Sequence, residues 1–300
     1  IDLAMLFIQY QVREDVWERH IKGYLKTRGT DNQMSTLELK TTKILAEVKD
    51  GIGWLTFNQP ERRNAICLEM WQGIGDVLEA YQADPEVRVV VMTGAGGKAF
   101  ASGADISEFD QHRSNAEQRR NYEEISARGN AWLAKFSKPL IGMIHGFCIG
   151  GGLATALNAD VRFATPASTF GIPAAKLGLG YEYAGLAKLA RLVGPSVARD
   201  IMFTARFMDA EEAKSIGLIN FVVEASELEQ AVTDYARLIA ANAPLTVFAA
   251  KAAVDAFEKY SMTEASREVA HLVDTCFDSE DYKEGRKAFA EKRSPVFQGK

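Results

Sequence analysis

Two glycine-rich segments, residues 98–106 and 146–152, hold the residue types whose spacing suggests chemistry. Each follows an apolar run, and the second ends in three consecutive glycines. Glycines at a strand-to-helix turn let backbone N–H groups face a ligand, and a helix N-terminus adds the positive end of its dipole. Two such turns side by side could aim two N–H groups at one oxygen, which is an oxyanion hole. The residues alone leave a phosphate loop and a plain tight turn open as alternatives.

Neither segment matches the common nucleotide-binding patterns. No Gly-Lys-Ser/Thr follows the glycines, as a Walker loop requires, and they lack the spacing of the dinucleotide fingerprint. His145 stands at a strand end before the second segment, where we interpret it as a structural residue rather than a base. The other histidines, His20, His112 and His271, form no metal-ligand cluster, so we predict no metal.

The elements that position these segments follow from the hydrophobic pattern. Residues 44–49 alternate as a strand does, Asp50-Gly51 is a hairpin signal, and residues 53–58 pair back. Asn64 is expected to cap a helix whose apolar residues recur at helical spacing as far as Tyr81. Apolar runs typical of buried strands are 87–93 and 140–144, and 161–164 is predicted as another short strand. Helices are predicted over 116–136 and 153–159.

Strands that alternate with helices predict βαβ units and a mainly parallel sheet, an α/β fold. Beyond residue 210 the pattern is mainly helical, with helices predicted over 211–216, 227–242, 245–260, 264–276 and 280–291. We interpret residues 1–33, which precede Met34, as an appendage that is not native to the domain; a regulatory or targeting arm is the alternative.

Composition excludes several classes of protein. The net charge of −5 argues against a non-specific nucleic-acid binder, and no run of about 18 apolar residues predicts a membrane span. Three scattered cysteines are too few for a disulfide framework, which favours a reducing, cytoplasmic location.

A set of motifs, taken in order, carries a resemblance to a known family. They are Pro60, 64–66, 99–106, 146–152, Asp160, 170–173, 217–220 and 222–223. Together they resemble the enoyl-CoA hydratase/isomerase (crotonase) superfamily, from about Ile44 to Phe297. The resemblance implies a crotonase-like core of stacked ββα turns over residues 44–209 and a C-terminal helical trimerisation region over 210–300. It also implies an acyl-CoA thioester ligand, coenzyme A as part of the substrate with no other cofactor, and a homotrimer or dimer of trimers.

The resemblance assigns an oxyanion hole to the peptide N–H groups of Ala104 and Gly151. Enoyl-CoA hydratases carry two glutamates, one two residues after the glycine triplet and one after the proline of Phe-Gly-x-Pro. Here these positions are Ala154 and Ala174. Hydration needs a base to activate water and an acid to protonate carbon, so the two-glutamate mechanism is missing.

Tyr181 and Glu182 lie on the loop that lines the acyl pocket in this family. Relatives place an acid near Glu182, which makes it the candidate acid/base in an enzyme of enolate chemistry. A second hypothesis is a decarboxylase of malonyl-type CoA esters that uses Tyr181. A third is a non-catalytic acyl-CoA-binding protein, and the simplest is that this segment only begins the next helix.

Contacts to the coenzyme are assigned by the same resemblance. Arg62 and Arg63 stand where relatives place a basic residue near the CoA phosphates, with a solvated loop as the alternative. The remaining candidate contacts are Ala101, Gly103, Asp105, Ile106, Gly150, Phe289 and Lys292. Asp105 is also expected to cap the helix that follows it. For Phe289, the alternative to a coenzyme contact is a structural role in the hydrophobic core.

Overall fold

A computed structural model describes residues 35–105, 116–259 apart from 178, 180 and 182, and 272–300 apart from 273 and 292. Residues Met34–Lys300 form one compact unit. The expected appendage and three candidate site residues (Ile106, Glu182 and Lys292) lie outside the described residues, as does the side chain of Phe289.

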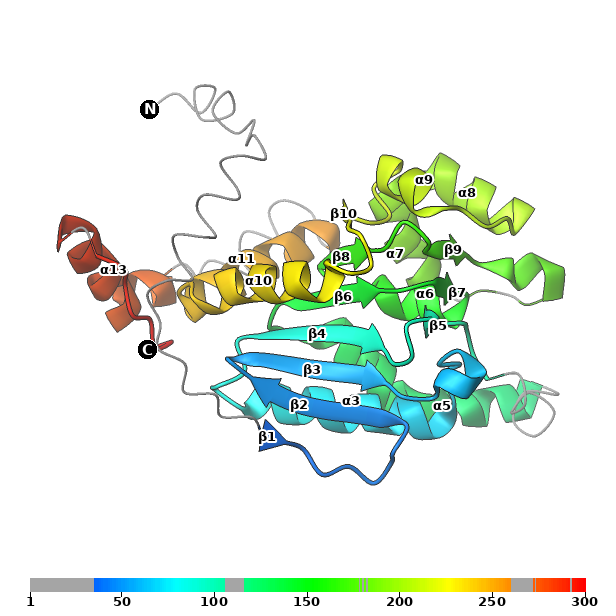
Figure 1. Cartoon of the computed structure of the whole chain (residues 1–300), viewed down its shortest axis with the longest axis horizontal. Helices are drawn as coiled ribbons and strands as arrows, with labels where there is room; N and C mark the ends of the chain where they lie inside the picture. Colours follow the sequence, from blue (N-terminus) through cyan, green and yellow to red (C-terminus); the bar gives the residue numbers. More distant parts are fainter. Residues whose placement is uncertain are drawn as a thin grey trace. The chain divides into compact units, whose positions relative to one another are not determined.

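The main sheet has seven strands in the order β1-β2-β3-β4-β6-β8-β10 (Figure 1). Their bounds are β1 Ser35–Thr36, β2 Ile44–Lys49, β3 Ile52–Phe57, β4 Val89–Gly94, β6 Leu140–Ile144, β8 Val161–Ala164 and β10 Phe221–Val222. The pairs β1–β2 and β2–β3 are antiparallel and all later pairs are parallel, which confirms the mainly parallel sheet. The predicted hairpin is confirmed as well, because Asp50 and Gly51 both have positive φ and Lys49 pairs with Ile52.

The two faces of this sheet are covered by different helices. Along β4, Val90 and Met92 join the core beneath the helix α3 (Leu68–Ala83), whereas Val89 and Val91 pack with α10 (Leu228–Ala240). Alternate residues of a strand point to opposite faces, so an apolar run is what a sheet covered on both sides requires.

A second sheet of three short parallel strands stands beside the first. It consists of β5 Ala99–Ala101, β7 Phe147–Ile149 and β9 Thr169–Gly171, in that order. The first glycine-rich segment contains β5 and the second contains β7, and each continues past the end of its strand. The sequence pattern did not predict this second sheet, because strands of three residues are too short to show an alternation of apolar and polar residues.

The remaining helices lie between and after the strands. They are η1 Pro60–Arg62, α5 Ala116–Lys135, α6 Gly151–Ala156, η3 Pro173–Leu177, α7 Tyr183–Val193, α8 Pro195–Thr204, α9 Ala210–Ser215, α11 Pro244–Lys259 and α13 Glu280–Glu291. Between the helices expected over 211–216 and 227–242, Phe221–Val222 forms a strand, β10, which pairs with β8 and was not predicted. In the described part of the chain no single helix is long and apolar enough to cross a membrane; α10 and α11, bent by 105°, pass that test only as a pair.

Asn64 does not cap α3. The helix begins at Leu68 after Cys67, and Asn64 is fully buried with a φ of 55°. Its side-chain oxygen accepts from the Gln59 N–H at 2.9 Å, and its nitrogen donates to the carbonyls of Ala95 and Ala99 at 3.0 and 2.8 Å. The amide therefore fastens the loop before α3 to the turn between β4 and β5.

Candidate active site

The two glycine-rich segments meet at the ends of β5 and β7. Gly103 follows β5 with a φ of 122°, and Gly150 follows β7 with a φ of 54°. A Cβ placed on Gly151 would lie 3.4 Å from the nitrogen of Ala104. The structure thus brings together the two residues that the resemblance assigned to an oxyanion hole.

Backbone geometry sets the direction of the Ala104 N–H group. The carbonyl of Gly103 accepts from the Ile66 N–H at 2.7 Å, and the Asp105 N–H donates to the Ile66 carbonyl at 3.0 Å. In a trans peptide the C=O and N–H point in opposite directions. The Ala104 N–H, which shares its peptide with the Gly103 carbonyl, therefore points away from Ile66.

The Gly151 N–H is a helix-start donor. Gly151 is the first residue of α6, and the first bond of that helix runs from the Ala154 N–H to the Gly150 carbonyl at 3.0 Å. The first N–H groups of a helix have no partner inside it. Within the described residues, neither the Ala104 nor the Gly151 N–H donates a hydrogen bond.

Close packing holds the start of α6 in place. A Cβ on Gly152 would lie only 2.0 Å from the carbonyl oxygen of Ala101 at the end of β5, so no larger residue fits without movement. On the other side, the Gly150 N–H donates to the Gly171 carbonyl of β9 at 2.8 Å. The α6 N-terminus is therefore wedged between two strands of the small sheet.

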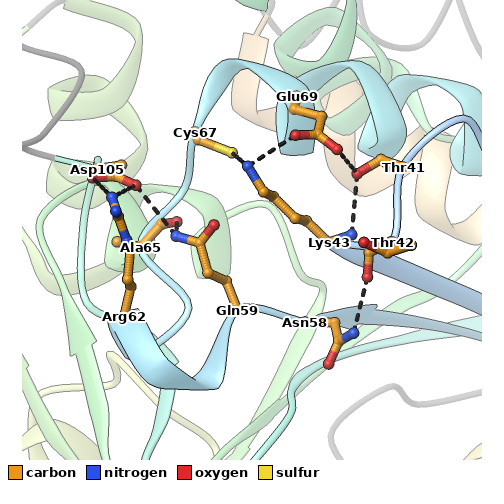
Figure 2. A network of polar contacts seen from close by, with 10 residues as sticks. All are labelled: Thr41, Thr42, Lys43, Asn58, Gln59, Arg62, Ala65, Cys67, Glu69 and Asp105. Carbon is orange, nitrogen blue, oxygen red and sulfur yellow. Dashed lines mark hydrogen bonds and ion pairs between the residues drawn. The ribbon is translucent and has the colours of Figure 1, made fainter.

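Figure 2 shows a polar network around the loop that precedes α3. In its first part, Nη1 of Arg62 lies 3.1 and 2.9 Å from the two carboxylate oxygens of Asp105, and Nε2 of Gln59 lies 3.2 Å from one of them. The Asp105 side chain is buried, at 8% exposure. Asp105 was assigned to helix capping or a coenzyme contact and Arg62 to the CoA phosphates; in this structure they bind each other. Gln59 was missed by sequence reasoning, because 46 residues separate it from Asp105.

The second part of the network in Figure 2 joins Lys43 to Glu69, 2.8 Å apart, with Thr41 bonded to the same carboxylate. The ammonium of Lys43 also lies 3.7 Å from the Cys67 sulfur. The hydrogen bond between Lys43 and Glu69 raises the pKa of Lys43 and lowers the pKa of Glu69. This pair joins the first turn of α3 to the residue just before β2, and no local pattern in the sequence predicted it.

Alanine occupies both positions at which the hydratase pattern has glutamate. Ala154 lies one turn into α6 and is half-buried, and Ala174 lies in η3 with 4% exposure. The carbonyl of Ala154 accepts from Asn158 at 3.0 Å, and Asn158 in turn accepts from Lys188 of α7 at 2.7 Å. Neither alanine has a side chain able to transfer a proton.

Tyr181 is held just before α7. It is half-buried and packs against the main core, and a Cβ on Gly185 would lie 3.5 Å from its ring. Glu182, the candidate acid/base, lies outside the described residues. The role of each remains a prediction.

Two other candidates have local environments that the structure defines. The guanidinium of Arg63 lies 4.8 Å from the centre of the Phe147 ring, on an exposed loop residue with a φ of 52°. His145 is half-buried; burial lowers its pKa, and the charge of Glu229 opposes this. In the described ranges no three metal-ligating side chains are grouped.

Comparison with known proteins gives one consistent result. The model of the family described as enoyl-CoA hydratase/isomerase matches residues 47–300. A short-chain-enoyl-CoA hydratase of Clostridium acetobutylicum is 33% identical over 85% of this chain and 97% of its own length. A carnitinyl-CoA dehydratase of Salmonella typhi is 32% identical over 82% of this chain and 94% of its own. The solved structure of an enoyl-CoA hydratase/carnithine racemase from Magnetospirillum magneticum superposes with a TM-score of 0.81, at 36% identity over 91% of this chain and all of that one.

Proposed function

Because this chain belongs to the enoyl-CoA hydratase/isomerase family, we propose that it is an enzyme that forms an enolate from an acyl-CoA thioester. The observation that carries the proposal is that Ala104 and Gly151 lie side by side, and that neither N–H group donates a hydrogen bond within the described residues. Family membership also leads us to expect a homotrimer or a dimer of trimers, which light scattering would test.

The proposed hole acts on the thioester carbonyl. When a proton leaves the α-carbon, the electron pair moves toward the carbonyl oxygen, which becomes negatively charged. Two N–H donors at that oxygen stabilise this charge more than they stabilise the neutral carbonyl, so they lower the barrier. The loss of one such donor typically lowers the rate about 100- to 1,000-fold. Because the donors are main-chain groups held by packing, they need no reorientation during the reaction.

A separate side chain must accept the α-proton. Ala154 and Ala174 lack an ionisable group, and the carboxylate of Asp105 is already bonded to Gln59 and Arg62. We therefore assign this role to Glu182, which immediately precedes α7. Its carboxylate takes the proton from the α-carbon and returns it either there or at another carbon of the enolate, which gives exchange or isomerisation respectively.

Tyr181 supports a second candidate reaction. Its ring is packed between the core and the first turn of α7, so its hydroxyl is carried on a fixed support. A fixed hydroxyl could orient the carboxylate of a malonyl-type CoA ester, which leaves as CO₂ while the same hole stabilises the resulting enolate. The two candidates differ in whether a base or a leaving carboxylate generates the negative charge.

The test is deuterium exchange at the α-carbon of butyryl-CoA in D₂O, followed by mass spectrometry. We expect wild-type protein to exchange and the Glu182→Gln variant to exchange at least 100-fold more slowly. Tyr181→Phe is the matched control and should stay within about 3-fold of wild type. Absence of exchange in the wild type, with CO₂ release from malonyl-CoA that Tyr181→Phe abolishes, would replace the proposal by the decarboxylase. Binding of butyryl-CoA without either reaction would indicate a non-catalytic acyl-CoA-binding protein.

A further inference from the structure

We propose that Gln59, Arg62 and Asp105 form a clamp that positions the Ala104 N–H group of the oxyanion hole. We call these three residues the Asp105 clamp. The inference rests on the proposed function and assigns the three side chains a positioning role. It also changes the role of Arg62 from a phosphate contact to a partner of Asp105.

The clamp acts on the residue next to the donor. Asp105 follows Ala104 directly, and its own N–H is bonded to the Ile66 carbonyl. Its carboxylate is bonded to Arg62 and Gln59, which lie just before Ile66 in the same loop (Figure 2). Main-chain and side-chain bonds of Asp105 therefore reach the same loop. Together they keep the Gly103–Ala104 peptide from rotating.

The segment needs such support because Gly103 is conformationally free. Its φ of 122° is open to glycine alone among common residues, and a glycine beside the donor allows the peptide to turn in the absence of other contacts. A buried carboxylate held by charged and amide donors is a strong anchor, because charge-assisted hydrogen bonds are about twice as strong as neutral ones. Asp105 supplies that anchor two residues after the glycine.

The loop that supports the clamp is itself fastened to the main sheet. Asn64 is fully buried and bonds to Gln59, Ala95 and Ala99, so the loop cannot shift relative to the end of β4. The Ser102 N–H also donates to the carbonyl of Arg63 at 3.0 Å. By contrast, the Gly151 donor is held by close packing of α6 on β5. Each donor of the hole thus has its own means of support.

The experiment uses acetoacetyl-CoA and butyryl-CoA with the full chain. Acetoacetyl-CoA ionises to an enolate that absorbs in the near ultraviolet, so the fraction ionised at saturation measures the hole without turnover. The variants are Arg62→Met, Asp105→Asn and Gln59→Leu, with Arg62→Lys as the conservative replacement. Arg128→Met is the matched control, because Arg128 pairs with Asp76 and Glu79 on the surface. Thermal unfolding of each variant will establish whether it is folded at the assay temperature.

We expect Arg62→Met and Asp105→Asn to lower α-proton exchange of saturating butyryl-CoA about 10-fold or more, since a donor displaced by about 1 Å can cost 100-fold. The enolate fraction of bound acetoacetyl-CoA should fall in parallel, while the dissociation constant changes less than about 3-fold. Arg62→Lys should restore most of the exchange, because a single nitrogen of Arg62 makes both contacts to Asp105. Gln59→Leu should have a smaller effect in the same direction.

Three results would overturn the clamp. One is wild-type exchange and enolate fraction in folded Arg62→Met and Asp105→Asn. Another is weaker acetoacetyl-CoA binding with an unchanged enolate fraction at saturation, which would assign Arg62 to the coenzyme phosphates. The third is a wild-type protein that neither exchanges butyryl-CoA nor ionises acetoacetyl-CoA; in that case the proposed function fails and the clamp fails with it.

Discussion

The contact between β5 and α6 allows the smallest possible perturbation of the hole, Gly152→Ala. The added Cβ would lie 2.0 Å from the Ala101 carbonyl oxygen, whereas ordinary contact begins at 3.4 Å. The two segments must therefore separate by about 1.4 Å. Because Gly151 begins α6 and Ala104 follows β5, this movement separates the two donors. A misplacement of about 1 Å can cost 100-fold in rate, so we expect exchange of butyryl-CoA to fall by about that factor.

The Gly152→Ala variant should nevertheless stay folded. Overpacking a well-packed site costs about 1–3 kcal/mol, which a large domain tolerates. The measurements are α-proton exchange at saturating butyryl-CoA and the free energy of unfolding from urea denaturation. Gly285→Ala is the control: it also adds a methyl group to a helical glycine, but its nearest contact is 3.5 Å from Phe297. We expect this variant to keep wild-type exchange.

The reasoning would be refuted by a folded Gly152→Ala protein that exchanges butyryl-CoA at the wild-type rate. Such a result would mean that α6 moves without displacing the reactive N–H, or that the hole lies elsewhere. A fall in exchange no larger than the loss of folded protein would also refute it. Loss of exchange in Gly285→Ala as well would indicate a general sensitivity to added bulk.

Three further predictions concern other parts of the chain. The double variant Ala154→Glu/Ala174→Glu should hydrate crotonyl-CoA at least about 10-fold faster than wild type, measured by loss of enoyl absorbance, because it restores an acid and a base. Lys138→Met should lower the free energy of unfolding in urea by about 1–3 kcal/mol, since the ammonium donates at 2.6 Å to two main-chain carbonyls at the end of α3. Burial lowers the pKa of His145 from 6.5, so the unfolded state binds its proton more readily. Wild-type stability should therefore fall as the pH drops through and below 6.5, and His145→Gln should reduce that fall in urea titrations at several pH values.

Local signals predicted much of the main sheet. The hairpin at Asp50 and Gly51 requires two residues with positive φ, and that preference is visible in the residue types themselves. The strand β4 was predicted because burial on both faces demands an apolar run. The helix α5, predicted over 116–136, is observed over Ala116–Lys135. In each case the pattern of neighbouring residues was enough to predict the element.

Features that depend on distant partners escaped prediction. Asn64 is a good helix cap by type, yet two of its three side-chain hydrogen bonds reach the β4–β5 turn, more than 30 residues away, and the third stays within its own loop. The strand β10 has only two residues and exists because β8 offers it an edge. In the Asp105 clamp, Asp105 is likewise 43 positions from Arg62 and 46 positions from Gln59. Contacts between residues so far apart in the chain cannot be predicted from composition or periodicity.

In the candidate site, too, one part could be predicted from the sequence and another could not. The glycine segments suggested main-chain donors by themselves, and the resemblance identified Ala104 and Gly151, which the structure brings together. The acid/base residue could not be identified in this way. Its family positions are occupied by Ala154 and Ala174, and Glu182 was chosen from its place in the chain.

This division has a physical cause that bears on what the enzyme does. The proposed hole consists of peptide groups, so its geometry would depend on how β5, β7 and α6 pack, and substitutions that preserve packing would leave it intact. A proton-transferring group is a side chain, so a single substitution can remove it or supply it elsewhere. A chain can therefore retain the stabilisation of an enolate while the reaction that forms or consumes that enolate changes. With alanine at both hydratase positions, we propose that the choice between isomerisation and decarboxylation depends on Tyr181 and Glu182, which are adjacent in the sequence between η3 and α7.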